Sequence, residues 1–269
     1  MRGSGRKPAV MLLVLCAGLV VASPIEAQTP LPAGFVRLGE VAPTVRQDMR
    51  YAGAINFTGR PVPGYTANVC ILARPVALAL ARVQATLAPR GLTLVMLDCY
   101  RPERATRAFM AWAARSAKPG ERQRWHPRID RSDVVPLGYV SRSSSHSRGV
   151  AVDLTLARIA ARTTEASAAP VTKNKGAAGA SDTAARVETC RAPGAERALI
   201  GALEMGSGYD CFDETSHTAA RDIEADARAN RRLLLAAMQA EGFVNYRREW
   251  WHFTLNVPGF ARAHDFPVD

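Results

Sequence analysis

The spacing of apolar side chains predicts strands at three places in the chain. In the segment VAVDLTL, residues 150–156, apolar side chains recur at every second position, which is the period of a half-buried strand. This alternation places Asp153 on the face opposite the valines. A compact apolar run at residues 92–97 predicts a buried strand that ends at Asp98, and residues 250–257 are also strand-forming.

Helical spacing predicts three helices. Residues 75–88 carry Pro in the first turn, and residues 102–117 begin with Pro and Glu, both common at helix starts. A longer helix spans residues 222–239 and is ended by Gly242. Residues 51–65 are rich in turn residues and predict an ordered loop.

Two segments differ in composition from the rest of the chain. Residues 1–27 have the pattern of a cleaved secretory signal, because basic residues precede an uncharged apolar run that is too short for a comfortable membrane span. An uncleaved membrane anchor is the alternative. The remaining residues, 28–269, fit a single α+β domain. Within it, residues 160–195 are rich in Ala, Thr, Ser and Gly and predict a flexible surface insertion.

Charge and cysteine content agree with export. The formal net charge is +11, which suits an anionic envelope or wall polymer, although a biased genome composition also explains it. Nucleic acid is the rival partner, but export argues against it and no binding motif is present. Four cysteines follow the signal segment, and of three possible disulfide connectivities proximity in sequence favours Cys70–Cys99 and Cys190–Cys211.

Three short segments carry candidate site residues, and two of them have residues suited to metal chemistry. His146 precedes Gly149, where a turn can bring the imidazole towards Asp153 and form half of a metal site. In EWWH, Glu249 is a potential general base beside the potential ligand His252. An ideal strand would point these two to opposite faces, so a bulge or turn is needed; the alternative is a buried aromatic strand with a hydrogen-bonded histidine.

Arg101 lies where a predicted strand gives way to a predicted helix, a common location for functional residues. The alternative is a surface ion pair. The motifs together resemble the D-alanyl-D-alanine dipeptidases of the vancomycin-resistance type, within the wider D,D-peptidase group. They are, in order, NFTGRPVPGY, YRP at 100–102, SSHSRGVAVDLTL at 144–156, MGSGYDCFDETSH at 205–217, EWWHF at 249–253 and DFPV at 265–268.

This resemblance implies a role for each matching residue. His146, Asp153 and His252 would bind one Zn²⁺ and leave a fourth position open, as a catalytic zinc site requires. Glu249 would be the general base that takes a proton from water and passes it to the leaving amine. Arg101 would steady the oxyanion of the tetrahedral intermediate.

The resemblance also implies how the substrate is held. Asp210 would face the amino end of the dipeptide D-Ala-D-Ala, and Ser144 would help to hold it. For Asp210 the alternative is a loop carboxylate that caps a turn. Cys211 directly after Asp210 is a departure from the family, and through Cys190 it could tether the pocket loop to the insertion.

The expected protein is therefore an exported, periplasmic zinc peptidase that cleaves D-Ala-D-Ala with metal-activated water. Its expected fold is α+β, a Hedgehog/D,D-peptidase-like zinc fold with a central antiparallel sheet flanked by helices, with no stable membrane span after signal removal. The alternatives are a D,D-carboxypeptidase that acts on peptidoglycan stem peptides and a non-catalytic, zinc-dependent wall-binding protein.

Overall fold

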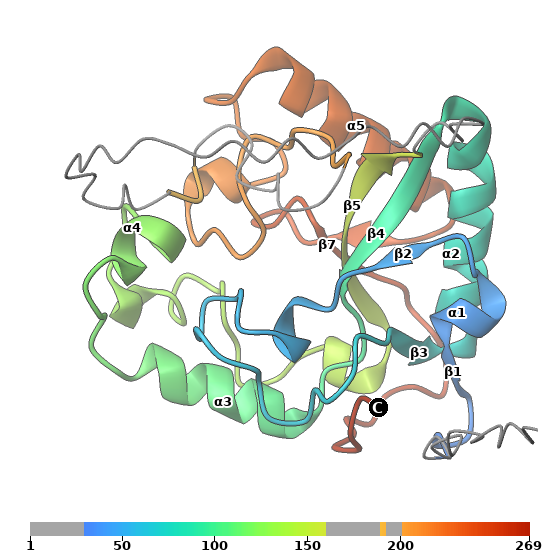
Figure 1. Cartoon of the computed structure of the whole chain (residues 1–269), viewed down its shortest axis with the longest axis horizontal. Coiled ribbons are helices and arrows are strands. Elements are labelled where there is room, and N and C mark those ends of the chain that lie inside the picture. The colour runs from blue at the N-terminus through green and yellow to red at the C-terminus, as the bar shows by residue number, and fades with distance from the viewer. Residues whose placement is uncertain (1–29, 160–188, 192–200) are drawn as a thin grey trace, which may run out of the picture. The chain divides into compact units, whose positions relative to one another are not determined.

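The computed structural model of the protein (Figure 1) describes residues 30–159, 189–191 and 201–269. Within it, Leu31–Asp269 groups as one compact unit. The predicted signal segment lies outside the described residues, and so does the predicted insertion, apart from residues 189–191. No helix among the described residues is both long enough and apolar enough to cross a membrane.

The described residues contain seven strands in two sheets. A small antiparallel sheet pairs β1 (Phe35–Arg37) with β3 (Ile71–Ala73). The larger sheet has the order β2-β4-β5-β7-β6. Its strands are β2 (Arg46–Gln47), β4 (Leu92–Asp98), β5 (Ala151–Arg158), β6 (Val244–Asn245) and β7 (His252–Thr254).

The larger sheet is mixed rather than wholly antiparallel. The pairs β4–β5, β5–β7 and β6–β7 are antiparallel as expected, but β2 runs parallel to β4. Parallel neighbours need a long connection, usually with a helix, and the chain between β2 and β4 contains β3 and a helix. A strand as short as β2 has too few residues to display a period-two pattern, so the sequence did not reveal it.

The predicted helices are present, with shifted ends. The α-helices of the described residues are α1 (Leu38–Val41), α2 (Arg74–Leu87), α3 (Glu103–Ala113), α4 (Glu121–Trp125) and α5 (Ala225–Ala240). Helix α3 ends at Ala113, whereas the prediction continued to residue 117. Pro119 restricts Lys118 to extended conformations and so limits the helix to residue 117 at most, and the helix ends four residues before that limit.

Helices α2 and α5 pack on each other and cover one face of the central strands, since α2 contacts β4 and α5 contacts β5. Figure 1 shows α2 on one side of these strands and α3 and α4 on the other. Strand β5 is buried on both faces from Ala151 to Ala157, so the prediction of a half-buried strand was wrong. Val152 and Asp153 point to opposite faces of the strand, both are buried, and Asp153 lines the cavity described below.

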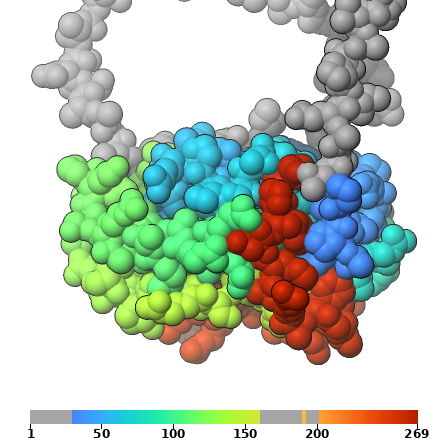
Figure 2. Space-filling view, turned by 90° about the horizontal axis from the view of Figure 1, so that it is seen from below, coloured from blue at the N-terminus to red at the C-terminus, as the bar shows by residue number. Residues whose placement is uncertain are grey.

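The C-terminal segment lies beside the N-terminal part of the domain that contains β1, as Figure 2 shows. Val268 forms a bridge with Tyr65, and the carbonyl of Val268 accepts a hydrogen bond from the Thr66 amide at 2.9 Å. The Phe266 ring lies edge-on to Phe35, with 5.1 Å between the ring centroids. The DFPV motif therefore joins the two ends of the domain.

Both favoured disulfides are confirmed. Cys70–Cys99 joins the residue before β3 to the residue after β4, with 5.3 Å between the Cα atoms. Cys190–Cys211 joins residues 189–191 to the segment after the expected insertion, with 5.4 Å between the Cα atoms.

Candidate active site

The register of the larger sheet aligns three polar residues on one face. Strand β4 is irregular between Met96 and Asp98, and the irregularity brings Asp98 opposite Asp153 of β5. Asp153 in turn lies opposite His252 of β7. Residues that are directly opposite on paired strands project to the same side of a sheet, so these three side chains form a row.

His146 approaches this row from a turn. Residues His146–Arg148 form a short 3₁₀ helix, and Gly149 ends it in the left-handed region with φ 71°. A Cβ atom at residue 149 would clash with the Phe35 ring, so both the backbone conformation and the space require glycine. The turn predicted before β5 is confirmed, and it directs the imidazole towards Asp153.

The imidazoles of His146 and His252 and the carboxylate of Asp153 form a compact cluster. Nε2 of His146 lies 3.2 Å from Oδ1 of Asp153, Nδ1 of His252 lies 2.9 Å from the same oxygen, and the two nitrogens are 3.1 Å apart. All three potential ligand atoms are within 4.8 Å of one another. Burial opposes ionisation of Asp153, but the two imidazoles outweigh it and hold the pKa of this carboxyl well below its usual range.

These potential ligand atoms fit a metal ion that binds nitrogen and oxygen ligands. Nδ1 of His146 lies 2.7 Å from the carbonyl oxygen of Cys99, and donation to that oxygen leaves Nε2 free to bind a cation. Two imidazole nitrogens and one carboxylate oxygen form a set of three protein ligands typical of catalytic zinc sites. The three residues that resemblance assigned to the metal are therefore brought together by the fold.

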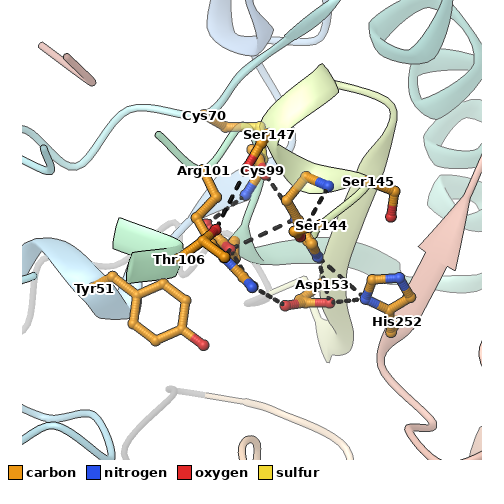
Figure 3. A network of polar contacts seen from close by, with 12 residues as sticks. Tyr51, Cys70, Cys99, Arg101, Thr106, Ser144, Ser145, Ser147, Asp153 and His252 are labelled. Carbon is orange, nitrogen blue, oxygen red and sulfur yellow. Dashed lines mark hydrogen bonds and ion pairs between the residues drawn. A yellow bond between two sulfur atoms is a disulfide. The ribbon is translucent and has the colours of Figure 1, made fainter. Parts of the chain in front are cut away.

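Arg101 lies beside this cluster and is held by Asp98. Its Nε donates to Oδ2 of Asp98 at 2.9 Å, and its Nη2 is 2.8 Å from the same oxygen and 3.5 Å from Oδ2 of Asp153. Figure 3 shows Arg101 and His252 on opposite sides of Asp153. The guanidinium carbon also lies 4.9 Å from the centroid of the Phe109 ring. Since its partner Asp98 is fully buried, the alternative of a surface ion pair is wrong.

Glu249 reaches the cluster through a turn. The Glu249 amide donates to the carbonyl of Tyr246 at 2.9 Å, and the His252 amide donates to the carbonyl of Glu249 at 3.3 Å. This turn replaces the start of the strand that was expected from residue 250 and brings Oε2 of Glu249 to 3.8 Å from Nδ1 of His252. Burial raises the pKa of Glu249 well above its usual range, and the carboxylates of Asp153 and Asp210 raise it further.

A cavity of about 340 Å³ joins all seven residues assigned from the sequence. Its lining contains Arg101, Ser144, His146, Asp153, Asp210, Glu249 and His252.

The two residues assigned to substrate binding differ in their surroundings. Oγ of Ser144 accepts a hydrogen bond from the His146 amide at 3.2 Å, so this hydroxyl also supports the turn that carries His146. The carboxylate of Asp210 accepts from the Tyr51 hydroxyl at 3.0 and 3.1 Å. Tyr51 belongs to a distant segment, so the hydrogen bonds that the Asp210 carboxylate accepts from it are not those of a turn cap.

Sequence reasoning missed four residues that complete the site. Asp98 is fully buried and accepts a hydrogen bond from the Tyr65 hydroxyl at 2.6 Å. The Tyr209 hydroxyl donates to Oδ2 of Asp153 at 2.9 Å, and its oxygen lies 3.0 Å from that of Tyr51. A carboxylate that ends an apolar strand was a usable signal for Asp98. The tyrosines lie in turn-rich segments whose pattern does not distinguish a site residue from any other.

Comparisons with known proteins agree with these motifs. The profile of one protein family, described as D-ala-D-ala dipeptidase, matches residues 32–163 and 190–269. A D-alanyl-D-alanine dipeptidase from Enterococcus faecium is 36% identical over 236 residues, which cover 87% of this chain and 98% of that protein. One from Enterococcus faecalis is 36% identical and covers 82% of this chain and 91% of its own length. One from Streptomyces coelicolor is 34% identical, and the match covers 87% of this chain and 98% of that protein.

Proposed function

The chain belongs to the D-Ala-D-Ala dipeptidase family of metallopeptidases, and on that basis we propose that it hydrolyses the dipeptide D-Ala-D-Ala to D-alanine with one Zn²⁺ per chain. One observation carries the proposal. A single cavity gathers two imidazoles and a carboxylate, whose potential ligand atoms lie within 4.8 Å of one another, together with a buried glutamate, an arginine and a further buried carboxylate. Its volume of about 340 Å³ is at the small end of ligand sites, which span roughly 300 to 1,000 Å³.

His146, Asp153 and His252 would hold the zinc ion. When bound, Zn²⁺ supplies a Lewis acid that polarises the scissile carbonyl and lowers the pKa of water. Two nitrogen ligands and one carboxylate suit zinc better than they suit Mg²⁺ or Ca²⁺, which prefer oxygen ligands.

Glu249 and Arg101 perform the other chemical roles. Glu249 takes a proton from the attacking water and delivers it to the nitrogen of the departing D-alanine. Its position 3.8 Å from a proposed zinc ligand supports this role. Arg101, which Asp98 orients towards the cluster, donates to the oxygen that becomes negative as the peptide carbonyl is attacked.

The rest of the cavity distinguishes a dipeptide from a longer peptide. The buried carboxylate of Asp210, oriented by Tyr51, binds the free ammonium group of the dipeptide. Ser144 contributes to holding the substrate from the turn beside His146. A D,D-carboxypeptidase would instead have to admit an amide and a longer stem at the position of that ammonium group, and a non-catalytic wall-binding protein would need neither Glu249 nor Arg101.

Export to the periplasm belongs to the same proposal. Its support is the signal pattern of residues 1–27 and the two disulfides, which persist in oxidising compartments. Cell fractionation should recover the protein with the periplasmic fraction, and sequencing of its N-terminus should start after Ala27. Full-length protein in the cytoplasm would contradict this part of the proposal.

A product assay tests the activity directly. The purified protein is incubated with D-Ala-D-Ala or with a pentapeptide stem, before and after metal removal by a chelator and after Zn²⁺ is restored. We expect free D-alanine from the dipeptide alone, loss of turnover with the chelator, and recovery with Zn²⁺. Release of D-alanine from the pentapeptide would support the carboxypeptidase, and turnover of neither substrate by zinc-loaded protein would support the wall-binding protein.

A further inference from the structure

Asp210 has an unusual backbone conformation. Among the described residues it is the one non-glycine residue with a positive φ, 58°. The left-handed region is unfavourable for residues with a Cβ atom, although Asp tolerates it better than most. A residue keeps such a conformation only when its surroundings hold it there. The contacts of this loop therefore decide where the Asp210 carboxylate lies.

The Cys190–Cys211 disulfide is directly attached to this residue. Cys211 follows Asp210, is fully buried, and is bonded to Cys190. The Gly208 amide donates to the carbonyl of Cys190 at 2.7 Å. The chain is thus fastened to the same short segment on both sides of Asp210, covalently after it and by a hydrogen bond before it.

Further contacts hold the loop that carries Asp210 and the segment that carries Cys190. The Ser216 hydroxyl donates to the carbonyl of Cys211 at 2.6 Å. On the opposite side, Nε of Arg191 lies 3.5 Å from Oδ1 of Asp213. Asp210 itself is oriented by the Tyr51 hydroxyl at 3.0 Å, a contact that a small shift of the loop would lengthen beyond hydrogen-bonding range.

We infer that the Cys190–Cys211 disulfide positions Asp210 for the ammonium group of the substrate, so that both cysteines are positioning residues for dipeptide affinity. This inference rests on the proposed role of Asp210 in recognition. Loss of the disulfide should therefore raise KM. Metal binding and the chemical step depend on other residues of the cavity and should be unaffected. Reduction of this disulfide would convert the protein into a folded enzyme with weak affinity for its substrate.

The second disulfide is a matched control. Cys70–Cys99 closes a loop of similar length, with sequence separations of 29 and 21 residues for the two bonds, so loss of either should lower stability to a similar extent. It lies beside the metal cluster, because the carbonyl of Cys99 is 2.7 Å from Nδ1 of His146. Its loss should therefore weaken zinc affinity rather than substrate affinity.

The test compares the double variants Cys190→Ala/Cys211→Ala and Cys70→Ala/Cys99→Ala in the zinc-loaded protein. We expect the first to raise the KM for D-Ala-D-Ala roughly tenfold or more, the loss expected for a weakened charged interaction, with kcat and zinc affinity within about twofold of wild type. The second should lower zinc affinity, measured by competition with a chelator, at an unchanged KM. Equal effects of both variants on KM would overturn the inference.

A cycle with Asp210→Asn separates the inference from the proposed function. If the disulfide acts through Asp210, its removal from the Asp210→Asn variant should raise KM no further. A raised KM for Asp210→Asn beside an unchanged KM for the disulfide variant would overturn the inference alone, whereas an unchanged KM for Asp210→Asn would refute the recognition role itself. If the double variant fails to fold, native reduction and alkylation of the wild type, mapped by mass spectrometry, gives the same comparison.

Discussion

The two sides of the cavity are built in different ways. On the metal side, Asp98, Asp153 and His252 are neighbours across paired strands, so the hydrogen bonds of the sheet fix their spacing. On the recognition side, Asp210 comes from a loop and Tyr51 from a short 3₁₀ helix far away in the chain, and they meet through the Tyr51 hydroxyl, which contacts both carboxylate oxygens of Asp210.

Site residues on paired strands and site residues on a loop are held in place by different kinds of contact. Strand pairing is cooperative and buried, and it resists the loss of any one contact. A loop depends on a few individual contacts, so each of them matters more. In this protein the loop that carries Asp210 has a disulfide at the next residue. Substitutions on the metal side should therefore change kcat or zinc content, and substitutions on the recognition side should change KM.

The largest effect is expected for Glu249→Gln. Glutamine has the size and hydrogen-bonding atoms to preserve the turn, but it cannot accept the proton of water. We expect kcat to fall by about 100- to 10,000-fold, with zinc content unchanged by elemental analysis. Glu241→Gln, which replaces a glutamate that does not line the cavity, is the control. A zinc-loaded Glu249→Gln protein with full activity would exclude Glu249 as the base.

A somewhat smaller effect is expected for Arg101→Lys. The ammonium group keeps the charge but cannot reproduce the two contacts that the guanidinium makes with Asp98, so the donor is no longer aimed at the developing oxyanion. We expect kcat to fall by about 100- to 1,000-fold at a nearly constant KM. Steady-state kinetics beside Arg104→Lys, whose arginine pairs with Asp265 away from the cavity, tests this. A change confined to KM would place Arg101 on the recognition side.

The sequence predicted the metal side better than the recognition side, for a physical reason. Buried strands and amphipathic helices leave periodic patterns, so β4, β5, α2 and α5 could be located from the sequence. The resemblance supplied the site residues, of which Asp153 lies on β5 and His252 on β7. The partners of those residues left no pattern. That Asp98 orients Arg101 depends on the irregularity in β4, and that Tyr51 orients Asp210 depends on how a short 3₁₀ helix meets a distant loop. Neither is encoded in local spacing.

On the recognition side, Tyr51→Phe should have a moderate effect. The substitution removes the hydroxyl that donates to Asp210 and preserves the ring, which packs against Phe109 with 4.8 Å between centroids. We expect KM to rise roughly tenfold, which corresponds to one hydrogen bond to a charged group, with kcat retained within a few-fold.

Tyr246→Phe is the matched control for this substitution. Tyr246 lines the same cavity, but its hydroxyl donates to the carbonyl of Gly138, so its loss should leave KM unchanged. Equal KM values for the two variants would show that the hydrogen bond of Tyr51 does not contribute to recognition.

The smallest expected effect is on stability and concerns Asp213, three residues after Asp210. The side chain of Asp213 is buried and accepts hydrogen bonds from Nε of Arg128 at 2.7 Å and from the Thr215 amide at 2.9 Å. Burial opposes ionisation of Asp213, but these hydrogen bonds outweigh it and hold the pKa of the carboxyl below its usual range. Since Arg128 is partly exposed, Asp213→Asn should lower the free energy of unfolding by only about 1 kcal/mol at pH 7.

The pH dependence of this difference distinguishes charge from packing. A carboxyl whose pKa is lower in the folded than in the unfolded state stabilises the fold above its unfolded pKa of about 3.9, and this contribution is lost as the pH falls through the folded pKa. Urea unfolding should therefore show a constant gap between wild type and Asp213→Asn from pH 8 to pH 5, and a shrinking gap below about pH 4. If the difference in unfolding free energy stayed the same at pH 3, Asp213 would support the loop through packing and not through its charge. The Cys190–Cys211 disulfide would then hold the loop of Asp210 without help from an ionised Asp213.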